Sequence, residues 1–233
     1  MRTGSTPVTR TTGTSMSEEW FIWQNKKQVG PGVFSLHDFL TPEIYSALKH
    51  EIRHAPNTWH NNYSNRIVCE NAHGPVILEL ATRLLPYLSE EFGGDYSVTT
   101  SKIYLDLSGS FMFPHFDSKE FAVSMQLYMP DIDLPALGTQ FCFNSDINSQ
   151  IEQNPNLISP SEPDFVLDSD YTMIAPFCKN HGYINFNQPR KIHRTLLVPE
   201  GLLRESVHFN FNVKQDNMLG LESIHYLTKK ELQ

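Results

Sequence analysis

The feature that most constrains the fold is a change of hydrophobic period near residue 97. Before it, apolar residues recur at helical spacing, as Ile44 and Leu48 do. After it, apolar and polar residues alternate, as in the segment that contains Ile103 and Leu105. A period near 3.6 is typical of helices, and a period of two is typical of strands with one buried face. The chain therefore predicts helices first and many short strands afterwards.

Two helices are predicted before this change. The first follows Thr41-Pro42, where threonine can cap the helix and proline fits the first helical position, and it ends before Pro56. The second runs from about Pro75 to Phe92 and ends at two glycines. Pro86 lies inside it and predicts a kink or an early end, because proline removes a helical hydrogen bond.

The strand-like part of the chain favours a mainly β fold with flanking α-helices. Helices followed by many short strands suggest a sandwich or barrel in which the N-terminal helices buttress one sheet. The polar interval 144–170 reads as a long irregular insertion, which is either a lid or binding loop or a disordered segment. The predicted strands lie at about 102–107, 121–129, 138–143, 171–177, 182–187, 192–198 and 204–213.

Domain organisation follows from length and composition. Residues 1–16 form a Thr-, Ser- and Gly-rich stretch without acidic residues, which predicts a disordered leader. The remaining residues, 17–233, fit a single domain with its β core at about 97–213. Leu221, Ile224 and Leu227 suggest a short closing helix at the C-terminus.

Charge and cysteine usage exclude some function classes. A net charge of −8 argues against a general nucleic-acid binder and favours a small-molecule substrate. No apolar run is long enough to cross a bilayer, so we expect a soluble protein with no membrane partner. The three cysteines, Cys69, Cys142 and Cys178, are odd in number and lack CxxC spacing. Buried thiols in a reducing cytoplasm explain them better than disulfides do.

His115 and Asp117 are the first candidates for chemistry. They are two residues apart on an extended segment, so both side chains point to the same side. With one more imidazole they would make a two-His, one-carboxylate face, which binds Fe(II) and leaves coordination positions open. His193 and His181 compete for the third position.

The last predicted strand carries a polar row on one face. Arg204, Ser206 and His208 share this face, whereas Val207 and Phe209 occupy the other and could pack against the helices. Such a row suits a wall of a wet pocket that holds a charged ligand. Arg204 would offer a planar fork to a carboxylate, with the Ser206 hydroxyl beside it.

Taken together, His115-Phe116-Asp117, His193 and Arg204-Glu205-Ser206 resemble the motif of the Fe(II)/2-oxoglutarate-dependent dioxygenases. The likeness covers about residues 97–213 and is strongest to the prolyl-hydroxylase-like and phage-type small members. It implies a double-stranded β-helix, the jelly-roll fold that cupins share. It also implies that His115, Asp117 and His193 are the catalytic iron ligands, and that Arg204 pairs with the distal carboxylate of 2-oxoglutarate. No Arg-x-Ser/Thr follows His181 at a comparable spacing, which favours His193 as the distal ligand.

The resemblance also implies the type of reaction. In this family Fe(II), 2-oxoglutarate and O2 together oxidise an unactivated C–H bond, and succinate and CO2 are released. Related halogenases lack the carboxylate ligand, so the presence of Asp117 favours hydroxylation. Desaturation and ring chemistry stay open.

Further residues are assigned more loosely. Tyr104 and Gln126 lie on polar faces of predicted strands, where the family often contacts 2-oxoglutarate, although aromatic packing and a satisfied interior amide are the alternatives. Arg190, His208 and Asn185 are candidates near the substrate: Arg190 would suit an anionic group, and Asn185 could support the metal ligands.

Four functions are compatible with these residues. The first is hydroxylation of a small molecule, such as an amino acid or another metabolite. A prolyl or peptidyl hydroxylase is the second. The third is a cupin-type metalloenzyme that does not use 2-oxoglutarate, and the fourth is a non-catalytic β-sandwich binding module.

Overall fold

A computed structural model describes residues 19–55, 59–61, 65–70, 74–158 and 166–214. The predicted leader 1–16 and the predicted closing helix after residue 220 lie outside these ranges. None of the helices in the described ranges is both long enough and apolar enough to cross a membrane.

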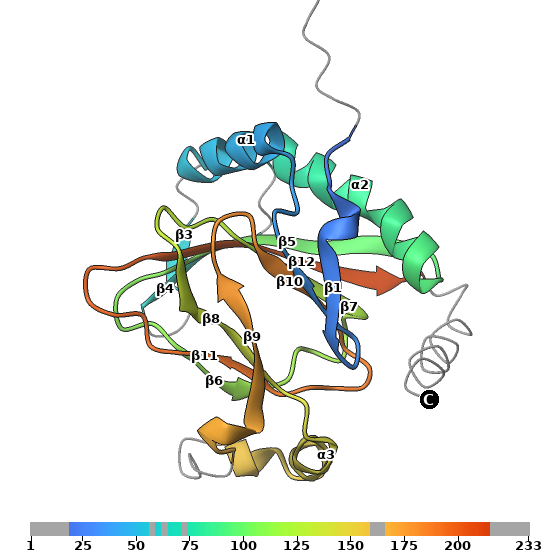
Figure 1. The fold of residues 1–233 in the computed structure, drawn as a ribbon, viewed down its shortest axis with the longest axis vertical. Coiled ribbons are helices and arrows are strands. Elements are labelled where there is room, and N and C mark those ends of the chain that lie inside the picture. The colour runs from blue at the N-terminus through green and yellow to red at the C-terminus, as the bar shows by residue number, and fades with distance from the viewer. Residues whose placement is uncertain (1–18, 56–58, 62–64, 71–73, 159–165, 215–233) are drawn as a thin grey trace, which may run out of the picture.

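Two antiparallel sheets form the body of the molecule (Figure 1). The larger has eight strands in the order β1-β2-β10-β7-β12-β5-β4-β3, and the smaller has four in the order β6-β11-β8-β9. This confirms the predicted mainly β, jelly-roll architecture. The larger sheet comprises β1 (Lys26–Gly30), β2 (Val33–Leu36), β3 (Trp59–Asn61), β4 (Arg66–Glu70), β5 (Tyr96–Asp106), β7 (Val123–Tyr128), β10 (Gly182–Phe186) and β12 (Arg204–Val213). The smaller sheet comprises β6 (Met112–His115), β8 (Leu134–Cys142), β9 (Tyr171–Phe177) and β11 (His193–Thr195).

Helices α1 (Pro42–Arg53) and α2 (Pro75–Phe92) cover the outer face of the larger sheet, as predicted (Figure 1). Their apolar stripes pack on the apolar face of β12, where Val207, Phe209 and Phe211 are fully buried. The opposite face of β12 is thereby left to line the space between the sheets. One strand thus separates the hydrophobic core from the polar interior.

The helix starts differ in detail from the predicted caps. Thr41 is the N-cap residue of α1, but its hydroxyl makes no capping hydrogen bond. The N-terminus of α2 is instead capped by Glu51 of α1, whose carboxylate accepts the backbone N–H groups of Val76 at 2.8 Å and Ile77 at 3.0 Å. A negative charge at this position also suits the helix dipole. The Glu51 side chain therefore links the last turns of α1 to the N-terminus of α2.

Of the two outcomes predicted for Pro86, an early end of α2 is wrong, because the helix continues to Phe92. The interval 144–170 is not irregular throughout: it contains α3 (Ser145–Gln153), which is capped by the Asn144 side chain, and short 3-10 turns. Residues 159–165 lie outside the described ranges. Strands β1 to β4 and β6 were not predicted. The 3-10 turns are η1 (Trp23–Asn25), η2 (Pro155–Ile158) and η3 (Asp168–Asp170).

The helix-to-sheet packing yields a first prediction, on stability. Leu84 of α2 is fully buried in the main core, whereas Leu78 of the same helix is 42% exposed. Leu84→Ala is expected to lower the free energy of unfolding by about 3 kcal/mol, because it leaves a cavity. Urea denaturation checks this. Leu78→Ala is the matched control and should cost less than about 1 kcal/mol; equal losses in both variants would contradict the packing described.

Candidate functional site

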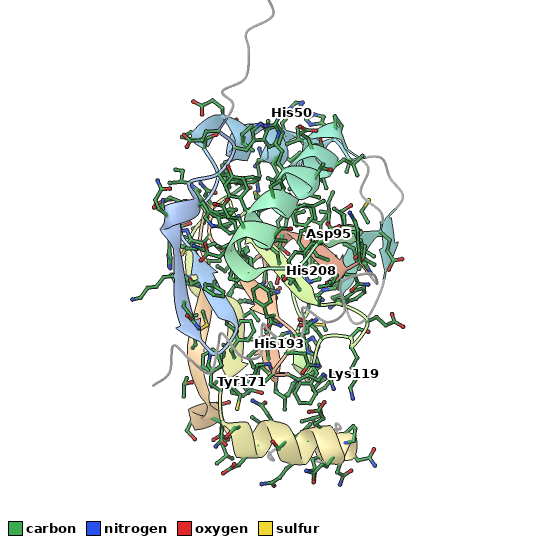
Figure 2. The ribbon with its side chains drawn as sticks, turned by 90° about the vertical axis from the view of Figure 1, so that its right-hand side faces the viewer. His50, Asp95, Lys119, Tyr171, His193 and His208 are labelled. Carbon is green, nitrogen blue, oxygen red and sulfur yellow. The ribbon has the colours of Figure 1, made fainter. Side chains whose placement is uncertain are left out.

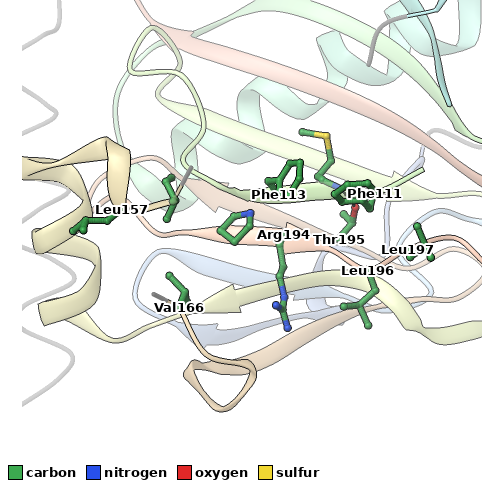
Figure 3. Close-up of a pocket in the computed structure, with 11 residues that line it drawn as sticks. Phe111, Phe113, Leu157, Val166, Arg194, Thr195, Leu196 and Leu197 are labelled. Atoms are coloured by element: carbon green, nitrogen blue, oxygen red, sulfur yellow. Dashed lines mark hydrogen bonds between the residues drawn. The ribbon is translucent and has the colours of Figure 1, made fainter. Parts of the chain in front are cut away.

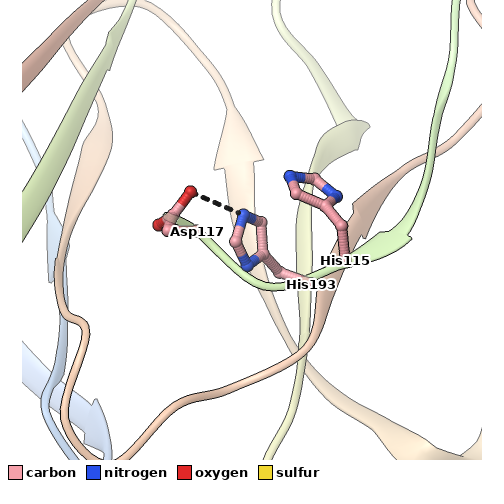
Figure 4. A group of neighbouring side chains, drawn as sticks. All are labelled: His115, Asp117 and His193. Atoms are coloured by element: carbon pink, nitrogen blue, oxygen red, sulfur yellow. Dashed lines mark ion pairs between the residues drawn. The ribbon is translucent and has the colours of Figure 1, made fainter. Parts of the chain in front are cut away.

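The predicted histidine and carboxylate residues meet between the sheets (Figure 4). His115 ends β6 and His193 begins β11, and the two are direct cross-strand partners. Their side chains therefore share one face. Asp117 follows β6 by two residues, and its Oδ1 lies 3.4 Å from His193 Nε2. The ligand atoms of the three residues all lie within 4.8 Å of one another, and in the described part of the chain they are the one such group that could hold a metal ion.

Backbone carbonyl groups orient both imidazoles. His115 Nδ1 lies 2.8 Å from the carbonyl oxygen of Phe113, and His193 Nδ1 lies 3.3 Å from that of Lys191. A carbonyl oxygen only accepts, so Nδ1 carries the proton in both rings. The neutral His115 ring then has its lone pair on Nε2, directed at the cluster. Burial alone would lower the pKa of His193, but the charge of Asp117 raises it, so a metal ion would displace the proton that His193 Nε2 shares with Asp117. Two nitrogen donors and one carboxylate oxygen are thus pre-arranged for a divalent cation.

The electrostatics of the cluster also suit a cation. Burial alone would raise the pKa of Asp117, but the charge of His193 and the hydrogen bond to it hold the pKa far below its usual value. Burial lowers the pKa of His115 to about 4, and the nearby His193 adds to this effect. The aspartate is therefore ionised and the His115 ring neutral, which are the forms that bind metal.

Two residues hold the Asp117 segment in place. Asn185 of β10 donates a hydrogen bond from Nδ2 to Asp117 Oδ2 at 2.9 Å. Arg190 donates from Nη2 to the backbone oxygen of Asp117 at 2.9 Å. Asn185 thus contacts the carboxylate itself, whereas Arg190 fixes the backbone behind it.

A cavity of about 90 Å³ extends from the cluster towards β12. Its wall includes Arg204, Tyr104, Gln126 and His208 from the larger sheet. Four of the predicted residues therefore share one space with His115, Asp117 and His193. Ser206 is not on the wall: its hydroxyl accepts a 2.7 Å hydrogen bond from Gln126 Nε2, and Gln126 Oε1 accepts one from Tyr183 at 2.9 Å.

Arg204 lines this cavity and is completely buried. Its Nη1 donates to Asp106 Oδ2 at 2.7 Å and its Nη2 donates to Thr139 Oγ1 at 3.1 Å. Thr139 is itself held by Tyr128, whose hydroxyl donates to Thr139 Oγ1 at 2.8 Å. Arg204 Nε is buried and has no hydrogen-bond partner in the described structure. A buried donor of a cationic group that has no partner indicates that a ligand supplies the hydrogen-bond acceptor.

Tyr104 and His208 line the side of the cavity, with ring centroids 5.5 Å apart. His208 and His193, both labelled in Figure 2, are buried. Burial lowers the pKa of His208 to about 4, although the charge of Asp117 opposes the shift. His208 is therefore neutral, and its buried Nδ1 makes no hydrogen bond to a described residue. Nδ1 is therefore a second buried polar group without a described partner, on a residue that lines the cavity.

The basic residues near His193 are already engaged within the protein. Arg190 stacks on Phe116 at 4.3 Å and lies 3.6 Å from Glu152. Lys191 is buried, which lowers its pKa to about 7, and it donates to backbone oxygens of Phe186 and Pro189. Neither side chain is therefore free to bind an anionic group of a substrate.

Arg194 pairs with Asp168 at 2.6 Å, so its charge is also satisfied internally. His181 lies away from the cluster, with its ring 4.7 Å from that of His37. The structure therefore brings His193, and not His181, to His115 and Asp117.

Arg66 and Asp106 are two further residues of the site that were not predicted. Arg66 of β4 lines the cavity, and its Nη2 donates to Asp106 Oδ2 at 2.9 Å. Asp106 lies two residues after Tyr104 on β5 and shares its face, so the polar face that contains Tyr104 could have suggested it. Arg66 carries no comparable signal, because its position depends on the pairing of β4 with β5, which no local pattern specifies.

A larger cavity of about 370 Å³ adjoins the first one along β6 and β11 (Figure 3). Met112 and Thr195 line both cavities, and most of the other residues around the larger one are apolar. The larger cavity therefore lies beside the metal-binding cluster, and the smaller one holds the groups suited to chemistry.

Comparisons with known proteins agree with this geometry at the level of the fold. No family model and no curated protein sequence matches the chain. HygX from Streptomyces hygroscopicus, solved with nickel and 2-oxoglutarate bound, superposes with a TM-score of 0.60 at 12% identity over 86% of this chain and 88% of that one. The α-ketoglutarate-dependent epimerase SnoN from nogalamycin biosynthesis gives 0.58 at 14% identity, over 82% and 79%.

A Pseudomonas putida prolyl-4-hydroxylase gives a TM-score of 0.54 at 14% identity, over 78% of this chain and 93% of that one. At such low identity these likenesses show the fold alone. The chain has the jelly-roll fold of the 2-oxoglutarate/Fe(II) oxygenases that it matches.

Proposed function

We propose that this chain is a non-haem Fe(II)- and 2-oxoglutarate-dependent oxygenase that hydroxylates an unactivated C–H bond of a small molecule. The observation that carries the proposal is the orientation of the cluster. Both imidazoles present Nε2, and with the Asp117 carboxylate they offer three ligands and leave positions open. When bound, Fe(II) with 2-oxoglutarate and O2 supplies the oxidising power, and succinate and CO2 are the by-products.

The cavity beyond the cluster favours 2-oxoglutarate as the co-substrate. Arg204 offers an unpaired, buried Nε donor, which suits the distal carboxylate of a dicarboxylic acid. Thr139 and Asp106 fix the guanidinium plane before any ligand arrives. A cupin-type enzyme without 2-oxoglutarate, or a non-catalytic binding module, would leave this buried arrangement without a purpose.

The remaining residues act by positioning and by burial. Asn185 holds one carboxylate oxygen of Asp117 and leaves the other for the metal. Tyr104, with a pKa that burial raises to about 12, stays protonated and closes one side of the cavity. The neutral His208 has a free Nδ1 and is the side chain that we assign to the substrate or the co-substrate.

A small-molecule substrate is favoured over a peptide. HygX and SnoN, which share the fold, have been solved with hygromycin B and nogalamycin RO bound. Arg190 is tied to Glu152 and to the backbone of Asp117, so we no longer assign it to an anionic group of the substrate. The free thiols of Cys69, Cys142 and Cys178 suit the reducing cytoplasm.

The proposal predicts that the purified protein converts 2-oxoglutarate to succinate only when Fe(II) and O2 are both present. A panel of metabolites is then screened for compounds that raise the rate, and mass spectrometry of the product separates hydroxylation, a gain of one oxygen, from epimerisation or ring closure. Turnover that does not depend on 2-oxoglutarate would favour the cupin-type enzyme. Protein that binds neither metal nor 2-oxoglutarate would favour a binding module.

A further inference from the structure

A second arginine faces the cavity from outside the segment that carries the sequence motif. Arg66 belongs to β4, is 7% exposed, and lines the cavity together with Arg204. Strand pairing places Arg66 opposite Asp106 and Asp106 opposite Arg204. The three side chains therefore form one row across β4, β5 and β12.

Asp106 is shared by both arginines. It is 1% exposed, and its two oxygens accept from Nε and Nη2 of Arg66 and from Nη1 of Arg204. Burial alone would raise its pKa, but the hydrogen bonds and charges of the two arginines hold the pKa below its usual value. Two guanidinium groups against one carboxylate leave one surplus positive charge in the row.

We propose that Arg66 is a positioning residue for 2-oxoglutarate, because by sharing Asp106 it keeps the charge of Arg204 from being cancelled. This inference rests on the proposed function. If Asp106 paired with Arg204 alone, the pair would be neutral, and an incoming carboxylate would meet the Asp106 carboxylate with no charge to offset it. In a buried site such a change in net charge weakens anion binding strongly.

The position of Arg66 argues against a purely structural role. Its guanidinium lies 4.6 Å from the Tyr104 ring, on the wall of the cavity. Only Nε and Nη2 are used by Asp106, and Nη1 makes no hydrogen bond to a described residue. A structural ion pair would not need to face the cavity that also contains Arg204 and the metal-binding cluster.

The test compares 2-oxoglutarate binding to full-length protein loaded with Mn(II), measured by titration calorimetry. Arg66→Gln keeps a polar side chain near Asp106 and removes only the charge, and it should raise the dissociation constant about tenfold or more. Arg66→Lys restores the charge and should bind within about threefold of the wild type. In turnover assays, KM for 2-oxoglutarate should rise in Arg66→Gln, whereas kcat at saturation should change little.

Lys49→Gln is the matched control. Lys49 is a buried cation that pairs with Glu205, the neighbour of Arg204 on β12, but on the opposite face of the strand. This variant should lose stability and keep its affinity for 2-oxoglutarate. An equal loss of affinity in Lys49→Gln and Arg66→Gln, or a loss in Arg66→Lys as large as in Arg66→Gln, would overturn the inference.

Failure of the inference can be told apart from failure of the proposed function. If wild-type protein with Mn(II) does not bind 2-oxoglutarate, the proposed function fails; if it binds and Arg66→Gln binds equally well, only the role of Arg66 fails. Should Arg66→Gln not fold, Arg66→Met takes its place, because it removes the charge and keeps an unbranched side chain beside Tyr104. It should weaken 2-oxoglutarate binding as Arg66→Gln does, and wild-type affinity in Arg66→Met would overturn the inference.

Discussion

Asp117→Ala is expected to abolish metal binding at the site, with at least about a 100-fold loss of metal affinity and of succinate formation. Asp117 supplies the one carboxylate among the three clustered ligands, and its Oδ1 lies 3.4 Å from His193 Nε2. Without it, two neutral imidazoles remain, and they compensate none of the charge of a divalent ion in a buried site. Metal content after dialysis, together with succinate formation, measures the effect.

Asp95→Ala is the control for this variant, because it removes a carboxylate whose 3.0 Å ion pair with Lys214 is half-exposed. It should retain the metal and the activity. Asp117→Ala protein that still binds metal like the wild type would exclude the proposed site. His193→Ala should behave as Asp117→Ala does, and full activity in it would return His181 to consideration.

Arg204→Ala is expected to raise KM for 2-oxoglutarate about 100-fold while metal affinity stays unchanged, a loss of about 2.7 kcal/mol in binding. Arg204 lines the cavity and is completely buried, and its unpaired Nε is the donor that we assign to the distal carboxylate. The substitution also deprives Asp106 of one of its two partners, but Arg66 still neutralises that carboxylate. The expected result is therefore a folded protein with a weakened co-substrate site.

Arg194→Ala separates this effect from a general loss of positive charge. Arg194 follows His193 directly, yet it pairs with Asp168 and lines the larger cavity, not the one that contains Arg204. KM for 2-oxoglutarate should not change in this variant. An unchanged KM in Arg204→Ala, or an equal rise in both variants, would contradict the assignment of Arg204.

The cluster of His115, Asp117 and His193 could be predicted because the order and spacing of these residues are visible in the sequence. Two of its members lie two residues apart, and the alternation of Arg204 with Val207 identified the polar face of the last strand. Arg66 and Asp106 could not be related to each other in this way. Their contact arises from the register of β4 against β5, and that register is determined by pairing across 40 residues of sequence.

The first four strands were missed for a related reason. β3 has three residues and β2 has four, which is too short for a period to be recognised. β4, with the sequence Arg-Ile-Val-Cys-Glu, does not alternate between buried and exposed positions. Strands that lie between other elements owe their conformation to those neighbours more than to their own pattern.

These early strands change what counts as the smallest working unit of the protein. β1 to β4 supply four of the eight strands of the larger sheet, and all of them precede residue 97. β2 pairs with β10, which carries Asn185, and β4 brings Arg66 to Asp106. A fragment cut to the motif-bearing segment would keep every residue that a pattern search recognises and would lose half of the sheet that holds them. Transplanting this site, or shortening the protein, therefore has to begin before β1.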